Sequence, residues 1–297
     1  MPHLPRSLAI VFTCVAAPAA QASADPQPLP MVQEFAGAHA HGMGMAHRAV
    51  GAGSEVVLFN PASMALGARY QAEVNYNFTG GQRLNDFAVG VVDSKSSPVA
   101  MGVTVSRLSG DREGLNPVLY RTAVAAAYAI GERLAVGAGL KHQRGDILRG
   151  DERRNLNLWT GSLGLAVQLG EMVRLAASWE NLAGVEPAMQ ALLVPAWALG
   201  GALTLGRLVV AADLRFDRRA ERRDTPDLFL GAELGLGTTL VGRGGYRVDT
   251  RLDREVVQAA TAGLGALGER ARVDLGLERE LRPGGPWSVY TALQLRM

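Results

Sequence analysis

The feature that constrains this chain most is a two-residue alternation of apolar and polar side chains that continues to the last residue. At its start, Tyr70 and Val74 alternate with Glu73 and Asn75, the pattern of a β-strand with one apolar and one polar face. The pattern recurs in about fourteen segments of roughly ten residues, enough for a tilted strand to cross a bilayer. We expect strands near residues 68–78, 84–92, 99–107, 120–130, 133–143, 156–169, 173–180, 196–205, 208–217, 227–236, 239–248, 256–267, 270–279 and 287–297.

The connections between these segments alternate in length. Short ones, such as residues 131–132 and 170–171, alternate with longer ones rich in charge or proline, such as residues 108–119, 144–155 and 217–226. Outer-membrane barrels have an even number of antiparallel strands, with tight periplasmic turns and longer external loops. Residues 68–297 are therefore predicted to form an all-β, transmembrane up-and-down antiparallel barrel of about 14 strands.

One stretch offers a helical alternative. Residues 187–206 carry no charge and are long enough for a single spanning helix. However, Pro195 lies in the middle of the stretch, and Trp197, Leu199 and Leu203 keep the two-residue period. A strand is the better interpretation.

The two faces of the predicted strands differ in kind. The apolar faces carry four tryptophans near the long-loop side, where an aromatic girdle at the membrane interface is expected: Trp159, Trp179, Trp197 and Trp287. The opposite faces carry charges of both signs, which cannot face lipid and so should line the lumen. Mixed signs favour ion pairing in a filled interior over an ion-selective pore. The lumen charges are Glu73, Lys141, Arg174, Glu180, Asp213, Arg215, Glu233, Arg243, Arg247, Arg272, Asp274, Glu278 and Arg296.

The N-terminus reads as a secretory signal. Arg6 precedes an apolar stretch, and Ala22-Ser23-Ala24 fits the small-residue cleavage rule, so residues 1–24 are expected to be removed. Cys14, the only cysteine, lies inside this stretch, and a thiol nucleophile, a cysteine metal site and a disulfide are thus excluded from the mature chain. Lys plus Arg number 30 against 28 Asp plus Glu, too even a balance for a nucleic-acid partner.

Residues 25–67 contain two short motifs that resemble the N-terminal signature of the FadL/PorV group of outer-membrane barrels. The matching residues are Gly42, Met43, Gly44 and Ala46, followed by Asn60, Pro61 and Ala62. Residues 180–184, 231–234 and 243–247 look like the PorV branch of that group. The resemblance implies a fourteen-stranded barrel whose N-terminal segment, residues 25–67, folds into the lumen as a hatch or plug.

The chain departs from that signature in two places. The acidic pair usual before Asn-Pro-Ala is replaced by residues 51–55, and the chain ends in Met297 where such strands commonly end in Phe. The predicted loops are also short for a fatty-acid transporter of the FadL type. We therefore carry over no ligand-binding residue from the family.

No constellation predicts catalysis or a cofactor. His39, His41 and His47 cluster in the expected hatch, but nothing fixes a metal-ligand geometry. Outer-membrane phospholipases pair a histidine with a serine two residues away on the lipid face, whereas His142 is followed at that spacing by Arg144. Without a nucleophile beside its base, this chemistry has no first step, and we expect no enzyme.

Two functions remain for a protein expected in the outer membrane of a Gram-negative bacterium, in contact with its lipid. The first is FadL-like passive passage of a small hydrophobic molecule. The second is a PorV-like, porin-shaped subunit of a secretion or surface-motility assembly, whose partner would be a secreted or envelope protein. The short predicted loops favour the second, both share the hatch signature, and passage is placed slightly ahead.

Overall fold

The computed structural model of the chain describes residues 35–51, 53–80, 83–111, 115–149, 152–182, 193–218, 226–250 and 256–297. The predicted signal, residues 1–24, and the first part of the leader lie outside the described residues.

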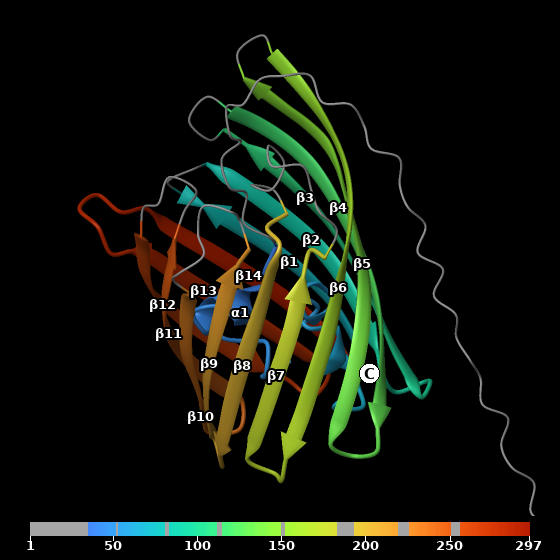
Figure 1. Cartoon of the computed structure of the whole chain (residues 1–297). Coiled ribbons are helices and arrows are strands. Elements are labelled where there is room, and N and C mark those ends of the chain that lie inside the picture. Colours follow the sequence, from blue (N-terminus) through green and yellow to red (C-terminus); the bar gives the residue numbers. More distant parts are fainter. Residues whose placement is uncertain are drawn as a thin grey trace, which may run out of the picture.

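Fourteen antiparallel strands form a closed barrel in which each strand pairs with its neighbours in sequence (Figure 1). The first strand also pairs with the last, with Val74 opposite Leu293. The predicted fold class is confirmed. The strands are β1 (Tyr70–Thr79), β2 (Leu84–Asp93), β3 (Val99–Gly110), β4 (Leu115–Ile130), β5 (Leu134–Arg149), β6 (Glu152–Leu169), β7 (Val173–Glu180), β8 (Ala196–Leu205), β9 (Leu208–Asp217), β10 (Asp227–Leu236), β11 (Leu240–Thr250), β12 (Val256–Leu267), β13 (Ala271–Glu280) and β14 (Trp287–Arg296).

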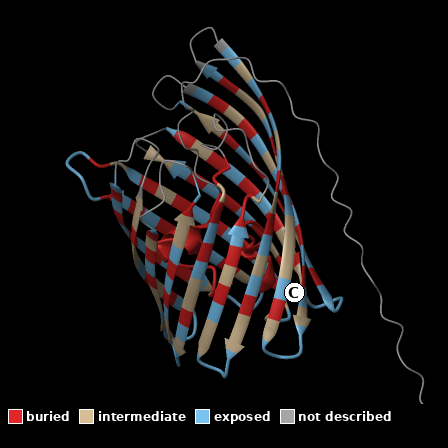
Figure 2. Ribbon diagram, in the orientation of Figure 1, coloured by how far each residue is buried: buried red, intermediate tan, exposed pale blue. Residues whose placement is uncertain are grey.

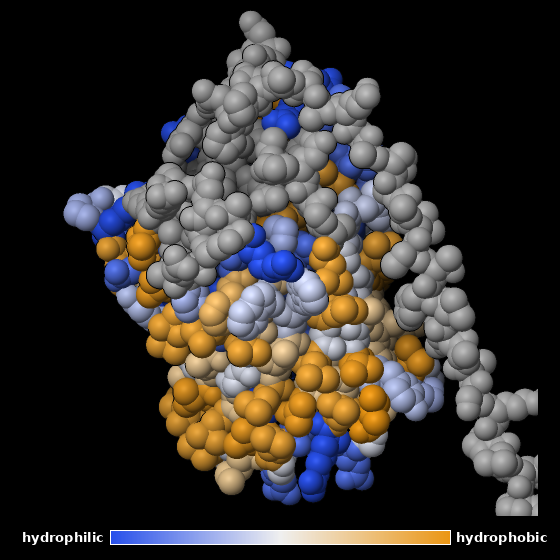
Figure 3. Space-filling model, viewed as in Figure 1, coloured by the Kyte–Doolittle hydropathy of each residue, from blue (hydrophilic) through white to orange (hydrophobic). Residues whose placement is uncertain are grey.

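The alternation in sequence becomes an alternation between the lumen and the exterior. Along β13, Asp274 and Glu278 are buried inside, whereas Val273 and Leu277 are exposed outside. Figure 2 shows this as alternating buried and exposed bands along the strands. Exposed apolar residues gather in a band around the lower barrel, with hydrophilic residues at its lower edge (Figure 3). Such an exterior suits lipid, because burying it in a bilayer removes no polar group from water.

The stretch with a helical alternative contains strand β8, as predicted. Trp197 and Leu199 face outward and are exposed, while Ala196 and Ala198 are buried. No helix among the described residues is long and apolar enough to cross a membrane.

Two of the predicted long loops are wrong. Most of residues 108–119 and 144–155 belong to β3, β4, β5 and β6, which continue as a ladder beyond the other strands. The extension rises above the rest of the barrel in Figure 1. These stretches resemble loops in sequence because the outer face of a strand need not be apolar beyond the bilayer. The two-residue alternation is therefore lost there.

The described part of the N-terminal segment, residues 35–66, lies inside the barrel (Figure 1). It contains two short helices, α1 (Ala38–Gly42) and α2 (Val56–Phe59), and one 3₁₀ turn, η1 (Pro61–Met64). The first helix contacts β11 to β14, and the other two elements contact strands between β3 and β7. We call these residues the lumenal segment. Its side chains are almost all buried, so the barrel interior is packed by this segment.

Candidate functional site

The Gly-Met-Gly motif of the lumenal segment lies against a pair of wall glycines. Gly231 of β10 is directly opposite Gly245 of β11. A Cβ on Gly231 would collide with the Met43 carbonyl, and one on Gly245 would collide with the backbone of Gly44. Gly44 itself has φ of +59°, a left-handed conformation that favours glycine. The motif therefore permits backbone-to-backbone approach between the segment and the wall.

The Asn-Pro-Ala motif uses a second pair of wall glycines in the same way. Gly137 of β5 is opposite Gly164 of β6, and a Cβ on either would meet the backbone of Ala62 or its neighbours. The Asn60 amide donates to the carbonyl oxygen of Leu165 at 3.3 Å. Pro61 begins η1, so the motif turns the chain against the wall. Sequence alone could not identify these glycine pairs, because they become neighbours only through strand register.

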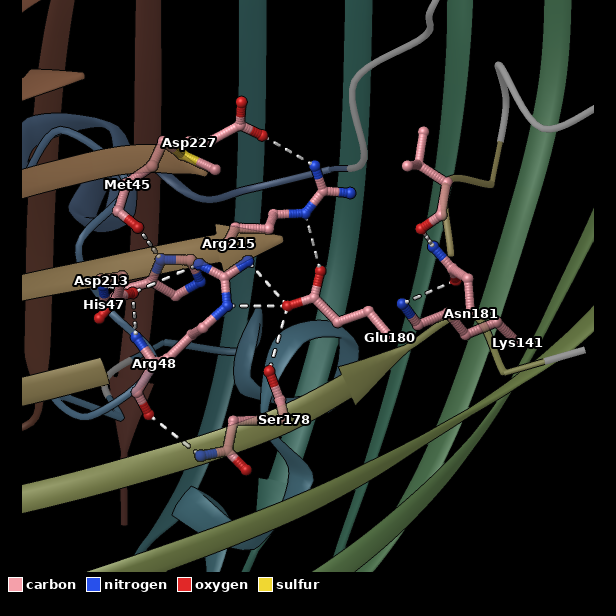
Figure 4. A network of polar contacts seen from close by, with 12 residues as sticks. Met45, His47, Arg48, Lys141, Ser178, Glu180, Asn181, Asp213, Arg215 and Asp227 are labelled. Carbon is pink, nitrogen blue, oxygen red and sulfur yellow. Dashed lines mark hydrogen bonds and ion pairs between the residues drawn. The ribbon is translucent and has the colours of Figure 1, made fainter. Parts of the chain in front are cut away.

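Arg48 is the centre of a buried ion-pair network (Figure 4). Its guanidinium lies 2.7 Å from Glu180 and 3.3 Å from Asp213. The Asp213 carboxylate also accepts hydrogen bonds from the backbone N–H groups of His47 and Arg48, both at 3.0 Å. Arg215 links Glu180 to Asp227 at 3.2 and 3.3 Å. Arg48 was not predicted, because only strand residues were assigned to the lumen.

A second network joins the lumenal segment to the adjoining part of the wall, strands β10, β11 and β13. His39 lies 3.0 Å from Glu233, which is also 2.7 Å from Arg243 and 3.4 Å from Arg272. Asp274 lies at ion-pair distance from both arginines, 2.8 Å from Arg243 and 2.7 Å from Arg272. These contacts bring together four of the predicted lumen charges and one segment histidine.

A third network surrounds His41. Its ring stacks on Tyr290 with centroids 3.4 Å apart and lies 3.5 Å from Glu278. Arg247 donates to Glu278 at 2.7 Å. His39 and His41 thus have different carboxylate partners. No group of three metal-ligating residues is found within the described part of the chain.

Of the remaining predicted lumen charges, Glu73 and Arg174 contact the lumenal segment, whereas Lys141 and Arg296 contact polar side chains outside it. Glu73 accepts from the Ser54 backbone N–H at 2.6 Å, and Arg174 donates to the Val50 carbonyl at 3.1 Å. Lys141 donates to Asn181. Arg296 is exposed near the end of β14, where it donates to Gln294.

His47 is held as a neutral ring. Its Nδ1 lies 2.8 Å from the Met45 carbonyl oxygen, and its edge packs on Phe59. Because a carbonyl only accepts, Nδ1 carries the proton. Burial, with the positive charge of Arg48, lowers the pKa of His47 to about 3.

Glu55 is a buried carboxyl that sequence reasoning did not single out. It has no exposed surface, and its two oxygens have no hydrogen-bond partner among the described residues. Burial raises the pKa of Glu55 well above its usual range, and the nearby Glu73 carboxyl adds to the shift.

A cavity lies between the lumenal segment and the inner wall of β3, β4 and β5. Counting the part that opens to solvent, it encloses about 370 Å³. Phe35 and Leu58 form its segment side, and Leu193 contributes a third apolar side chain. The wall side is mixed, formed by Thr104, Ser106, Arg121, Ala123, Lys141 and Gln143, together with Thr122 and His142 of the same strands.

The inner face of the extended strands is apolar, unlike the charged lumen beneath it. Leu108, Leu119, Ile147 and Leu156 belong to β3, β4, β5 and β6, and all are buried. Three of them lie in the stretches predicted as loops, where no face could be assigned. The external mouth of the barrel thus has an apolar wall on the side of the cavity.

The four predicted girdle tryptophans are exposed on the exterior. Trp179 of β7 is directly opposite Trp197 of β8, and Trp197 stacks on Phe216 of β9. Trp287 begins β14. Trp159 lies within β6, because this strand begins at Glu152 and not near residue 156 as predicted.

Comparisons with known proteins point to one class of barrel. No family model and no curated protein matches the chain. Among solved structures, the Ralstonia pickettii toluene transporter TbuX is similar with a TM-score of 0.67 and 15% identity, over 89% of this chain and 99% of that one. The CymD monoaromatic hydrocarbon channel gives 0.66 and 14%, over 88% and 96%. A Pseudomonas aeruginosa FadL homologue gives 0.62 and 12%, over 90% and 99%.

The chain shares their fold. At these identities the likeness concerns the fold alone, and it agrees with the FadL part of the resemblance seen in the sequence. The PorV branch stays a prediction. The structures compared are named as transporters, channels or FadL homologues, not as enzymes.

Proposed function

We propose that this protein is an outer-membrane channel for the passive passage of small hydrophobic molecules, with aromatic hydrocarbons as the first class to test. The observation that carries this proposal is the cavity beneath the apolar mouth. Leu108, Leu119 and Ile147 offer an apolar surface at the external end, and Phe35 and Leu58 continue it at the segment. Polar side chains such as Arg121 and Lys141 belong to the lining, but the surface that the cavity exposes is mostly apolar, as is typical of small-molecule sites.

The lumenal segment acts in this proposal as a hatch. It is fixed to the wall by Arg48 and His39, and its two motifs lie against wall glycines. A hatch of this kind keeps ions and polar solutes from crossing freely, because it fills a bore whose walls are charged. Motion of residues 35–66, or exit through the barrel wall, would release the hydrophobic ligand.

An outer-membrane location follows from the same argument. The exterior is an apolar band bordered by aromatic residues, and structures with a similar fold include the Acinetobacter baumannii outer membrane protein Omp33. A closed barrel satisfies every strand edge, which is what allows strands to exist in a bilayer.

The test uses a cavity-filling variant. Ala123 of β4 faces the cavity and is buried, so Ala123→Trp should block passage. Ala126→Trp on the outward face of the same strand adds the same side chain toward lipid and is the matched control. Cells that produce each protein are given labelled toluene, and the initial rate of uptake is measured.

We expect the native protein and Ala126→Trp to raise uptake above that of cells lacking the protein, and Ala123→Trp to return it to that background. Equal uptake with and without the native protein would contradict the proposal. That result would return attention to a PorV-like assembly role, which no observation among the described residues favours at present.

A further inference from the structure

Outward-facing arginines occupy the external rim of the barrel. Arg107 of β3 and Arg144 of β5 flank Tyr120 of β4, because strand register places Arg107 opposite Tyr120 and Tyr120 opposite Arg144. Asn157 of β6 continues the row beyond Arg144. All four are exposed, and neither arginine has a carboxylate within 4.0 Å among the described residues. We call these four residues the arginine row.

The arginine row lies at the level of lipid head groups. The next outward-facing row toward the membrane contains Thr122, His142 and Trp159. Trp159 is exposed and stacks on His142 with centroids 4.1 Å apart. A tryptophan on the exterior of a barrel marks the interface. The arginines lie two residues further out, about 7 Å along the strands.

The same rim carries two further arginines on tryptophan faces. Arg218 lies 5.5 Å from the Trp179 ring centroid, and Arg279 lies 4.9 Å from that of Trp287. Two other arginines at this end are paired with carboxylates, Arg153 with Asp146 at 2.6 Å and Arg282 with Glu280 at 3.0 Å. Among the described residues, the arginine row thus differs from these pairs in having no carboxylate partner.

The opposite rim differs. There Arg133 and Arg207 are accompanied by exposed carboxylates in the short turns, namely Glu132, Glu171 and Glu269. A requirement for solubility would apply to both rims alike. Among the described residues, Arg107 and Arg144 have no carboxylate in their own row, and two such cations at head-group depth favour an anionic neighbour on that side of the membrane.

We propose that the arginine row binds the phosphate groups of lipid A, the phosphorylated glycolipid of the outer leaflet. The planar guanidinium presents paired donors that match phosphate oxygens. Arg107 and Arg144 are two strands apart, about 10 Å, so each can take its own phosphate oxygen. The Tyr120 hydroxyl and the Asn157 amide lie in the same row to add neutral hydrogen bonds. This inference rests on the outer-membrane location proposed above, but not on hydrocarbon passage.

The test measures lipid binding by the full chain in detergent, using native mass spectrometry with added diphosphoryl lipid A. The double variant R107Q/R144Q removes both charges and keeps side-chain length similar. The matched control, R133Q/R207Q, removes the same charge from the opposite rim. Heat-modifiable migration on a gel verifies that each barrel is folded.

At about fivefold in affinity for each cation near an anionic lipid surface, R107Q/R144Q should bind lipid A about 30-fold more weakly. The control should stay within about twofold of the native protein. The native protein should bind fully dephosphorylated lipid A as weakly as the double variant binds the phosphorylated form, a comparison that needs no variant to fold.

Two results would overturn the proposal: equal loss in both double variants, or native binding to phosphatidylglycerol as tight as to diphosphoryl lipid A. Toluene uptake measured in parallel should be unchanged by R107Q/R144Q. Failure of lipid binding and failure of hydrocarbon passage are thus seen separately.

Discussion

Arg48 of the lumenal segment and Glu180 of β7 form an ion pair of 2.7 Å in which both side chains are almost fully buried. The residues are far apart in sequence, so this contact joins the segment to the wall by tertiary structure alone. A buried pair contributes little net stability against an apolar replacement, but losing one partner leaves an uncompensated charge. The pair therefore fixes the position of the segment more than it adds to overall stability.

Glu180→Gln should release the segment. Arg48 and Arg215 would both lose their shared carboxylate and keep only Asp213 and Asp227, respectively, at a cost of about 2 kcal/mol for the lost hydrogen bonds between charged groups. Limited proteolysis should then cleave within residues 35–66 while the barrel stays heat-modifiable. Asp146→Asn, which breaks the exposed pair with Arg153, should leave the cleavage rate unchanged.

Gly231→Val should displace the Met43-Gly44 turn, because a Cβ at this position overlaps the Met43 carbonyl. With the turn displaced, ion conductance in planar bilayers should rise severalfold above that of the native protein. Gly235→Val on the same strand is the control, since a Cβ there meets only the Arg207 side chain at ordinary distance. Equal conductance for both variants would argue against close backbone contact between the Gly-Met-Gly motif and Gly231.

The stability of the docked segment should fall in acid. His47 has a pKa of about 3 when buried and 6.5 when free, so the released segment binds a proton that the docked segment does not. The contribution of His47 is complete above pH 6.5 and is lost as the pH falls from 6.5 toward 3.

His47→Gln should flatten this dependence, measured as the difference in segment proteolysis between native and variant protein from pH 7 to pH 4. Taking the difference removes the contributions of all groups that both proteins share. An unchanged slope would contradict a neutral docked His47.

The four tryptophans should report an interfacial position. They are the only four tryptophans in the chain, and all are exposed on the exterior. The total tryptophan emission therefore comes from these four residues. In liposomes, a lipid-borne quencher at interface depth should dim the emission more than one at the bilayer centre. Stronger quenching from the centre would show that the strand ends are misplaced relative to lipid.

The sequence predicted the strands well because a barrel wall in lipid imposes one rule on every strand. Val273 and Leu277 must be apolar, while Asp274 and Glu278 can be charged, and the two-residue period follows directly. This requirement for apolar outward residues ends where β4, β5 and β6 extend beyond the membrane. Leu119 and Ile147 therefore lay in predicted loops, although they form the apolar mouth.

The candidate site was predictable only in part, because its contacts depend on register. Gly137 and Gly164 are far apart in sequence. The pairing of β5 with β6 places them opposite each other, where both contact the stretch from Asn60 to Ala62. Arg48 and Glu55 lie in a segment without a two-residue period, so no face could be assigned to them. The Gly-Met-Gly and Asn-Pro-Ala motifs were found because they resemble a family signature.

The most direct test of the central claim compares two solutes in the same cells. Initial uptake of a small aromatic hydrocarbon and of a neutral pentose is measured with and without the native protein, at equal amounts of folded barrel. The account predicts that the protein raises hydrocarbon uptake several-fold and leaves pentose uptake at background, because the lumenal segment fills the bore and the path past it is apolar. Equal increases for both solutes would contradict the account and identify a general porin.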